Sequence, residues 1–230
     1  MERYLPEAKM TGSITAQNAA LALLDHFCVP DPVHPKGEIH SVYYDTPCQH
    51  AYHDKANGDF LKSKARLRWY APDISKDSAK STAFFELKRR AGGGRRKSRS
   101  KLSLDQQWLH HAPLEDVGFM KILDEQRSEL GAELAADLFP MAVIKYTRYR
   151  YVYPPLAARV AVDTRIGSGR VNSGFLPGET DVEIPITVLE VKGDEPCDLP
   201  WLHELFSIGF RSRSFSKYGA CMAQLLGDER

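Results

Sequence analysis

The chain has 230 residues, of which 43% are hydrophobic and 27% are charged, with a net charge of +1. This composition excludes an extensively disordered chain and a uniformly basic protein that would bind any polyanion. The length fits one large domain, and we predict a single domain over residues 1–230.

Basic and acidic residues are segregated along the chain despite the small net charge. Residues 62–101 hold fourteen basic and three acidic side chains, whereas residues 115–137 hold seven acidic and two basic ones. Such segregation indicates a focused positive site.

The cysteines and the N-terminus indicate the compartment. The four cysteines, at positions 28, 48, 197 and 221, form no Cys-x-x-Cys pair and have no zinc-ligand spacing, so we expect free thiols in a reducing environment. The N-terminal residues lack a secretion signal, and no apolar run approaches the roughly 20 residues of a membrane helix. We therefore expect a cytoplasmic protein that does not itself span a membrane.

The N-terminal part of the chain predicts two strands and one helix. Residues Tyr4–Thr11 form a candidate edge strand, because they include a proline. Apolar side chains at helical spacing over Thr15–Phe27, preceded by a Ser or Thr cap, predict a helix that the proline-rich run Val29–Pro35 ends. Residues Glu38–Asp45 predict a second strand, and a loop over residues 46–58 follows.

Charged and apolar side chains alternate over Lys64–Tyr70 with the period of two that a strand produces. One face carries three basic residues and a tyrosine, and the other carries Ala65, Leu67 and Trp69. Five later segments repeat this alternation: Phe84–Arg90, Lys97–Lys101, Tyr146–Arg150, Arg159–Ile166 and Leu189–Lys192. A single charged strand face would most simply be exposed to solvent. Six such faces together favour a fold in which they all line one common interior.

A closed barrel can turn such charged faces inward and leave the apolar faces to be covered by helices. We therefore predict an α+β fold with a closed antiparallel eight-stranded β-barrel, a basic interior and helices packed outside. So many like charges around one cavity require a polyanion to neutralise them, because unpaired buried charge is costly.

The remaining segments complete the predicted order, in which the strands form an antiparallel meander. They are a polar connection at Ala71–Ser81, a glycine turn at Ala91–Gly94, an acidic helical insert at Trp108–Asp137 with Leu130, Leu134 and Leu138 at helical spacing, strands at Met141–Tyr153, Ala158–Ile166 and Ile184–Val191, a loop at Gly167–Gly178, and short helices at Leu199–Phe206 and Ser216–Leu226, the second capped by Ser216.

Arginines and lysines spaced two apart on several strands can contact successive phosphates, and the forked guanidinium suits bidentate contacts. The pattern therefore predicts a cradle for a triphosphate or polyphosphate. Nucleic-acid binding is the rival interpretation, with the basic run Arg95–Lys101 as its best candidate. Because such a run is more often an exposed loop, we do not expect nucleic acid as the main partner.

Three carboxylates lie two positions from a lysine on the predicted strands: Glu7, Glu86 and Glu190. Each is most simply a salt-bridge partner that relieves like-charge repulsion, and this account suits Glu86. A carboxylate that faces a phosphate needs a divalent cation between the two anions. We predict Glu190 as the metal ligand.

Several familiar motifs are absent or weak. Gly92–Gly94 has no Walker pattern and is predicted to be a turn. The histidine pairs His50 with His53 and His110 with His111 are predicted to lie on the surface. Without a His-Glu-x-x-His or Gly-x-Ser-x-Gly motif, neither a zinc hydrolase nor a serine hydrolase is supported.

Seven segments, in order, resemble a known family: Ser41–Pro47 with Tyr52 after it, Ala65–Tyr70, Phe85–Lys88, Tyr146–Arg148, Arg159–Asp163, Leu189–Lys192 and Ser216–Tyr218. The family is the polyphosphate-polymerase domain of the vacuolar transporter chaperone (VTC) proteins, in its stand-alone bacterial form, within the triphosphate tunnel metalloenzyme or CYTH-like superfamily. The resemblance implies a tunnel of eight antiparallel strands whose basic lining binds the phosphates of ATP and of a polyphosphate chain.

The resemblance also implies roles for individual residues. Arg66, Arg68, Lys88, Arg148, Arg159 and Lys217 would be catalytic residues that bind phosphate, Lys9, Lys101, Tyr146, Lys192 and Ser216 would be further phosphate-binding residues, and Glu190 would hold Mn²⁺ or Mg²⁺. The superfamily's first strand often reads Glu-x-Glu-x-Lys, but Leu5 replaces the first carboxylate before Glu7 and Lys9. This departure weakens the case for two-metal hydrolysis.

Three functions are therefore compared. The first is a metal-dependent phosphotransferase that extends polyphosphate with the terminal phosphoryl group of ATP. The second is a tripolyphosphatase or nucleoside triphosphatase with the same cradle, and the third is a non-catalytic module that binds polyanions. Regulation and export of a polymer would need separate partners, including a membrane protein.

Overall fold

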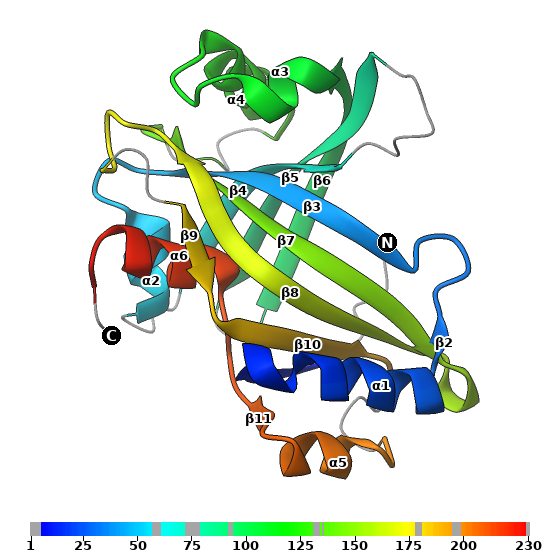
Figure 1. The fold of residues 1–230 in the computed structure, drawn as a ribbon. Coiled ribbons are helices and arrows are strands. Elements are labelled where there is room, and N and C mark those ends of the chain that lie inside the picture. The colour runs from blue at the N-terminus through cyan, green and yellow to red at the C-terminus, as the bar shows by residue number, and fades with distance from the viewer. Residues whose placement is uncertain are drawn as a thin grey trace. The chain divides into compact units, whose positions relative to one another are not determined.

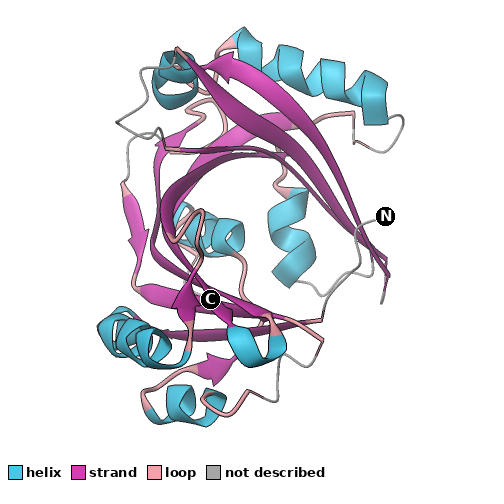
Figure 2. Ribbon diagram, turned by 90° about the vertical axis from the view of Figure 1, so that its right-hand side faces the viewer, coloured by secondary structure: helices cyan, strands magenta, loops and turns pink. Residues whose placement is uncertain are grey.

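The computed structural model describes residues 6–56, 61–71, 79–91, 94–130, 134, 136–177, 181–194 and 199–228. Strands account for most of the regular structure, and the long ones twist along their length (Figure 2). Leu5, Gly92, Gly93, Cys197 and residues 72–78 of the predicted polar connection lie outside the described residues. No helix in the described part of the chain combines the length and the apolar character needed to cross a bilayer.

Contacts group the chain into two compact units. Unit 1 comprises Met1–Glu38, Tyr146–Ile166 and Glu183–Lys217, and unit 2 comprises Ile39–Lys145, Gly167–Val182 and Tyr218–Arg230. The described strands are β1 (Glu7–Ser13), β2 (Val29–Pro30), β3 (Lys36–Asp45), β4 (Leu61–Tyr70), β5 (Lys80–Ala91), β6 (Gly94–Asp105), β7 (Phe139–Tyr153), β8 (Ala158–Val171), β9 (Val182–Ile184), β10 (Ile186–Lys192) and β11 (Arg211–Ser212).

The hydrogen-bonded strand order is β11-β1-β10-β8-β7-β3-β4-β5-β6, with β2 beside β7 and β9 beside β8. The prediction of a closed eight-stranded barrel is wrong, because the described sheet has eleven strands and two ends, β11 and β6. Strand β11 has only two residues, and β6 carries a row of basic side chains that includes Lys97 and Arg99. A very short edge strand and a densely charged one are both poor partners for pairing.

In unit 2, strands β3, β4, β5 and β6 form the predicted antiparallel meander. The alternation in β4 is confirmed, since Ala65, Leu67 and Trp69 are buried. Their face packs against Leu109 of helix α3 (Gln106–His111) and Phe119 of helix α4 (Val117–Leu130), which belong to the same buried apolar cluster. Figure 1 shows these two helices next to each other. The helical insert is therefore confirmed, although α4 ends at Leu130 and the predicted helical spacing does not continue to Leu134 and Leu138.

Helix α2 (His50–Ala56) occupies part of the segment that was predicted as a loop. The buried carboxylate of Asp45 explains the helix, because its Oδ1 accepts the Ala51 N–H at 2.8 Å and its Oδ2 accepts the Tyr52 N–H at 3.1 Å. Oδ2 also accepts the hydroxyl of Tyr218, in helix α6 (Lys217–Leu225), at 2.8 Å. Asp45 thus accepts hydrogen bonds from N–H groups in the first turn of α2, although it lies at the end of β3. A helix pattern read from neighbouring residues does not include so distant a cap.

In unit 1, β10 pairs antiparallel with β1 on one side and β8 on the other. Their apolar face, which includes Val162 and Leu189, packs against helices α1 (Gln17–Phe27) and α5 (Leu202–Ser207). The helix at Thr15–Phe27 is confirmed, but its start differs, because a 3-10 turn over Ile14–Ala16 precedes α1 and Ala16 occupies the cap position without a side-chain hydrogen bond.

Two strand predictions need correction. Strand β8 continues to Val171, where a loop from Gly167 was predicted. The exposed Arg165 has φ of 50°, and this left-handed residue interrupts the period of two on which the prediction depended. The single strand predicted over Ile184–Val191 is divided into β9 and β10 at Pro185, which has no backbone N–H.

Gly12, in β1, provides the first testable prediction. A Cβ at Gly12 would meet the buried Phe210 ring at 2.7 Å, whereas a Cβ at Gly37 would meet only the Arg150 Nη1 at 3.7 Å. We expect Gly12→Ala to lower the free energy of unfolding by about 1–3 kcal/mol through overpacking. The matched control Gly37→Ala should leave it unchanged or raise it slightly. Chemical denaturation measures both, and equal effects would contradict the prediction.

Candidate functional site

The basic face of unit 2 is defined here as Lys64, Arg66, Arg68, Glu86, Lys88, Lys97, Arg99 and Lys101. Register places these side chains in rows across β4, β5 and β6: Arg66 lies opposite Glu86, which lies opposite Arg99. The next row holds Lys64, Lys88 and Lys97, and the row on the other side holds Arg68, Phe84 and Lys101. The predicted alternation therefore brings basic residues of three strands onto one face.

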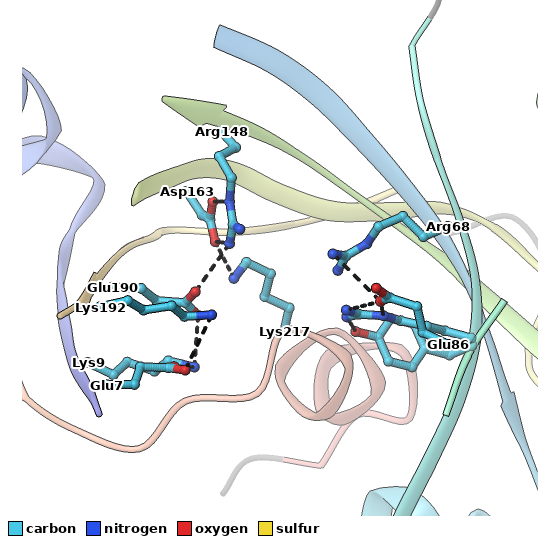
Figure 3. Close-up of polar contacts among 11 residues, drawn as sticks. Glu7, Lys9, Arg68, Glu86, Arg148, Asp163, Glu190, Lys192 and Lys217 are labelled. Carbon is cyan, nitrogen blue, oxygen red and sulfur yellow. Dashed lines mark hydrogen bonds and ion pairs between the residues drawn. The ribbon is translucent and has the colours of Figure 1, made fainter. Parts of the chain in front are cut away.

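Glu86 is the carboxylate at the centre of the basic face, with a side chain that is only 2% exposed. Its Oε2 lies 3.8 Å from Arg68 Nη1 (Figure 3). The same Oε2 accepts the Arg66 Nε–H at 2.8 Å, and Oε1 lies 3.0 Å from Lys97 Nζ. Burial alone would raise the pKa of Glu86, but Arg66, Arg68 and Lys97 outweigh it and hold that pKa far below its usual range. The prediction that Glu86 relieves like-charge repulsion agrees with these contacts.

The basic face remains strongly positive, because it contains seven basic side chains and a single carboxylate. Lys88 and Lys101 are exposed, and Lys97 and Arg99 are about 40% exposed. The Arg99 guanidinium also lies 3.5 Å from the centre of the Phe84 ring. Such a concentration of cations attracts an anion with several negative oxygens, such as a phosphate chain.

The carboxylate cluster of unit 1 is defined here as Glu7, Lys9, Arg148, Asp163, Glu190, Lys192 and Lys217. Its members come from β1, β7, β8, β10 and the first residue of α6, and their charged ends approach one another (Figure 3). Residues far apart in the sequence thus lie close together in unit 1. In contrast to the basic face, this cluster has three carboxylates against four cations.

Asp163 is fully buried and binds two of these cations. Its Oδ1 accepts the Arg148 Nε–H at 2.5 Å, and its Oδ2 lies 2.6 Å from Arg148 Nη2 and 2.5 Å from Lys217 Nζ. Burial would raise the pKa of Asp163, but Lys217 and Arg148 outweigh it and lower that pKa. Asp163 therefore stays ionised and holds the two cations at fixed positions.

Glu190 is the second buried carboxylate, with an 11% exposed side chain. Its Oε1 lies 2.8 Å from Lys9 Nζ, and its Oε2 accepts an N–H of Arg148 Nη2 at 3.3 Å. Burial would raise the pKa of Glu190, but Lys217, Lys9 and Arg148 hold it well below the usual range. Glu7 lies 3.4 Å from the same Lys9 Nζ and 3.6 Å from Lys192 Nζ.

The remaining predicted site residues of unit 1 have different surroundings. Tyr146 is buried, and the centre of its ring lies 4.7 Å from Lys217 Nζ and 5.5 Å from the Arg148 Cζ. Arg159 is exposed and lies opposite Lys192 in the ladder of β8 and β10. Ser216 is half-buried and directly precedes α6.

The structure adds residues that were not predicted for the site. Asp163 contacts Arg148, which is a predicted site residue, and Glu7 joins Glu190 at Lys9. Lys97 and Arg99 contact Glu86, which was predicted as a salt-bridge partner. The alternation did contain a signal for Asp163, because it lies on the same strand face as Arg159. It could not show which cation this carboxylate binds, since that depends on the pairing of β8 with its neighbours.

A divalent cation requires oxygen ligands that can approach one another. Within the described residues, no three His, Cys, Asp or Glu side chains form a group that could enclose a metal ion. Glu7 and Glu190 nevertheless approach each other closely enough to contact the same ammonium group. Mg²⁺ is usually held by one or two carboxylates together with waters and substrate phosphates, so this pair fits such a site and not a closed protein cage.

The solved structures that are similar to this chain include two proteins that are each described as a "putative adenylate cyclase". The Bacillus halodurans protein is 15% identical with a TM-score of 0.49, over 93% of this chain and 94% of the other, and the Vibrio parahaemolyticus protein is 11% identical with a TM-score of 0.44, over 93% and 97%. No curated protein sequence matches the chain. The model of the VTC domain matches residues 14–226, which confirms the resemblance found in the sequence. The chain therefore belongs to the VTC domain family.

Proposed function

We propose that this protein is a phosphotransferase that moves the terminal phosphoryl group of ATP onto a polyphosphate chain. Membership of the VTC domain family supports the proposal. The observation that carries it is the ionised, buried Glu190, which lies among Lys9, Arg148 and Lys217. Buried cations that surround a carboxylate are suited to bind phosphate together with a metal ion.

The transfer breaks the bond between the γ-phosphorus of ATP and the oxygen that bridges to the β-phosphorus, and it forms a bond to a terminal oxygen of the polyphosphate. ADP leaves, and the polymer gains one phosphate. Arg66, Arg68 and Lys88, and likewise Arg148, Arg159 and Lys217, would bind phosphate oxygens and stabilise the charge that spreads over them in the transition state. Lys9, Lys101, Tyr146, Lys192 and Ser216 would contribute further phosphate contacts.

Fixed positions are the main contribution of the protein in this scheme. Asp163 holds Arg148 and Lys217 through contacts of 2.5–2.6 Å, so these cations need little rearrangement when phosphate arrives. Glu190, assisted by Glu7, would hold Mn²⁺ or Mg²⁺, which supplies charge neutralisation to the phosphates when bound.

The wider context of the proposal follows from the family and the cysteines. We treat both compact units as parts of one domain, which the family match over residues 14–226 supports. The described cysteines Cys28, Cys48 and Cys221 are free thiols, which supports a reducing compartment such as the cytoplasm.

Product analysis tests the proposal directly. Purified protein is incubated with γ-labelled ATP, a short polyphosphate primer and Mn²⁺, and the products are separated by size. We expect labelled polymer longer than the primer, together with ADP. Labelled free phosphate alone would instead assign a triphosphatase, and retention of ATP without turnover, equally strong in chelator, would assign a non-catalytic polyanion-binding module.

A further inference from the structure

The segment Ser41–Pro47 has a tyrosine pair to which the proposed function gives no role. Tyr43 and Tyr44 are adjacent in β3 and point to opposite faces of the sheet. Tyr43 lies opposite Arg66 in the ladder with β4, on the side of the basic face. Tyr44 packs in the apolar cluster on the other side, where its hydroxyl donates to the Phe119 carbonyl at 3.1 Å.

Tyr43 contacts Arg66 at a part of the guanidinium that Glu86 does not use. The Tyr43 hydroxyl oxygen accepts the Arg66 Nη1–H at 3.0 Å, whereas Glu86 accepts the Nε–H and the Nη2–H. The ring of Tyr43 stacks on Tyr218, with centroids 4.7 Å apart and an angle of 13° between the planes. Arg66 is therefore held by two partners from different strands, and one of those partners is itself held by a stacked ring.

A guanidinium that is bound only along one edge can still rotate about the line of those hydrogen bonds. The hydrogen bond from Arg66 to Tyr43, on a third strand, restricts this rotation and fixes the plane of the guanidinium. Bidentate binding of phosphate depends on that plane, since two N–H groups must point at two oxygens together. Fixing the plane before the ligand arrives also removes part of the ordering cost of binding.

We propose that Tyr43 is a positioning residue, which fixes the Arg66 guanidinium in the orientation that receives the phosphates of a triphosphate or polyphosphate ligand. This inference rests on the proposed function for the ligand class only, and not on catalysis. The Tyr43 hydroxyl sets the affinity of the basic face, whereas the equivalent hydroxyl of Tyr44 serves the packing of unit 2.

Two single substitutions separate these roles, because Tyr→Phe removes a hydroxyl and keeps the ring. Binding of tripolyphosphate is measured by calorimetry in the presence of chelator, and the melting temperature is measured in parallel without ligand. We expect Tyr43→Phe to raise the Kd roughly tenfold, the scale of one hydrogen bond to a charged group, with little change in melting temperature. Tyr44→Phe should lower the melting temperature and leave the Kd unchanged.

A double-mutant cycle tests whether Tyr43 acts through Arg66. In an Arg66→Met background, the addition of Tyr43→Phe should change the Kd less than twofold, because the group that it positions is gone. A full tenfold effect in that background, or an unchanged Kd for Tyr43→Phe alone, would overturn the proposal. Protein that binds tripolyphosphate but produces neither polymer nor free phosphate from ATP would contradict the proposed function and leave the Tyr43 test valid.

The pH dependence of binding provides an independent check. Burial would raise the pKa of Tyr43. The positive charges of Arg66, Arg68 and Lys64 in β4 outweigh this effect and lower that pKa. Glu86 from β5 binds the same Arg66, and Tyr218 from α6 covers the ring. As the pH rises through the lowered pKa, a negative charge appears beside Arg66 and anion binding weakens. This alkaline weakening should be reduced in Tyr43→Phe and retained in Tyr44→Phe.

Discussion

Replacing Glu190 with glutamine is expected to reduce the rate of polymer formation by roughly 100-fold or more, the scale that the loss of one electrostatic contact in an active site produces. Glutamine keeps the shape of the side chain and one oxygen, which can accept from Lys9 or from Arg148, whereas its NH2 group replaces the other oxygen. It therefore removes the negative charge and one of the two oxygens that a divalent cation could use. Rates are measured with saturating ATP, primer and Mn²⁺.

Glu7→Gln is the matched control for Glu190→Gln. Glu7 contacts the same Lys9, but its side chain is 22% exposed, against 11% for Glu190. We expect Glu7→Gln to lower the rate far less than Glu190→Gln. Manganese binding, followed by electron paramagnetic resonance in the presence of a non-hydrolysable ATP analogue, should weaken in the Glu190 variant. Unchanged turnover in Glu190→Gln would show that the metal ligand is assigned wrongly.

Replacing Glu86 with glutamine is expected to give the largest loss of stability. The change leaves Arg66, Arg68, Lys97 and Arg99 around a buried site that no longer has a negative charge. Breaking a buried ion pair costs about 3 kcal/mol, at the low end of the usual range because solvent screens the half-exposed Lys97 and Arg99. For a chain of this length, the melting temperature should fall by roughly 10 °C.

The same variant should be rescued by its ligand. Tripolyphosphate can supply the negative charge that Glu86→Gln removes, so it should raise the melting temperature of the variant more than that of the wild type. The exposed Glu129 of α4 accepts from Ser100 at 3.1 Å, and Glu129→Gln is the control that should change stability by less than about 0.5 kcal/mol. A Glu86 variant as stable as this control would refute the central role of the carboxylate.

The stability that Glu86 contributes also has a defined pH window. Its pKa is lowered on folding, so the contribution is fully present above the unfolded pKa of about 4.3. It is lost as the pH falls through the lower folded value. The difference in stability between wild type and Glu86→Gln should therefore stay constant between about pH 6 and pH 8 and shrink only in strong acid.

Local patterns in the sequence predicted most helices and strands of this protein. They failed where the structure depends on a contact between residues that are distant in the sequence. The alternation of charged and apolar residues located β4, β5, β6, β7, β8 and β10, because a strand imposes a period of two on any half-buried face. It could not predict the open sheet, since closure depends on which edges pair. It also missed α2, because Asp45 caps that helix from the end of a strand.

The same division holds for the candidate site. Basic residues two apart predicted the basic face, and a carboxylate two positions from a lysine indicated the salt-bridge role of Glu86. The assignment of Glu190 as the metal ligand stays a prediction. The partners of these groups depend on register across strands: Glu86 meets Lys97 and Arg99 only because β5 pairs with β6 as it does. Tyr43 lies in a segment that carried the family resemblance, but its contact with Arg66 requires the pairing of β3 with β4.

The buried carboxylate of Asp45 has a consequence for how the end of the chain can be altered. It accepts the hydroxyl of Tyr218, and Tyr52, whose N–H it also accepts, donates its own hydroxyl to Asp228 at 2.6 Å. If the chain ended before Tyr218, the Asp45 carboxylate would lose the tyrosine that covers it. Water could then reach the carboxylate and the start of α2. Proteolysis that removes the last helix should therefore loosen residues about 170 positions earlier in the chain.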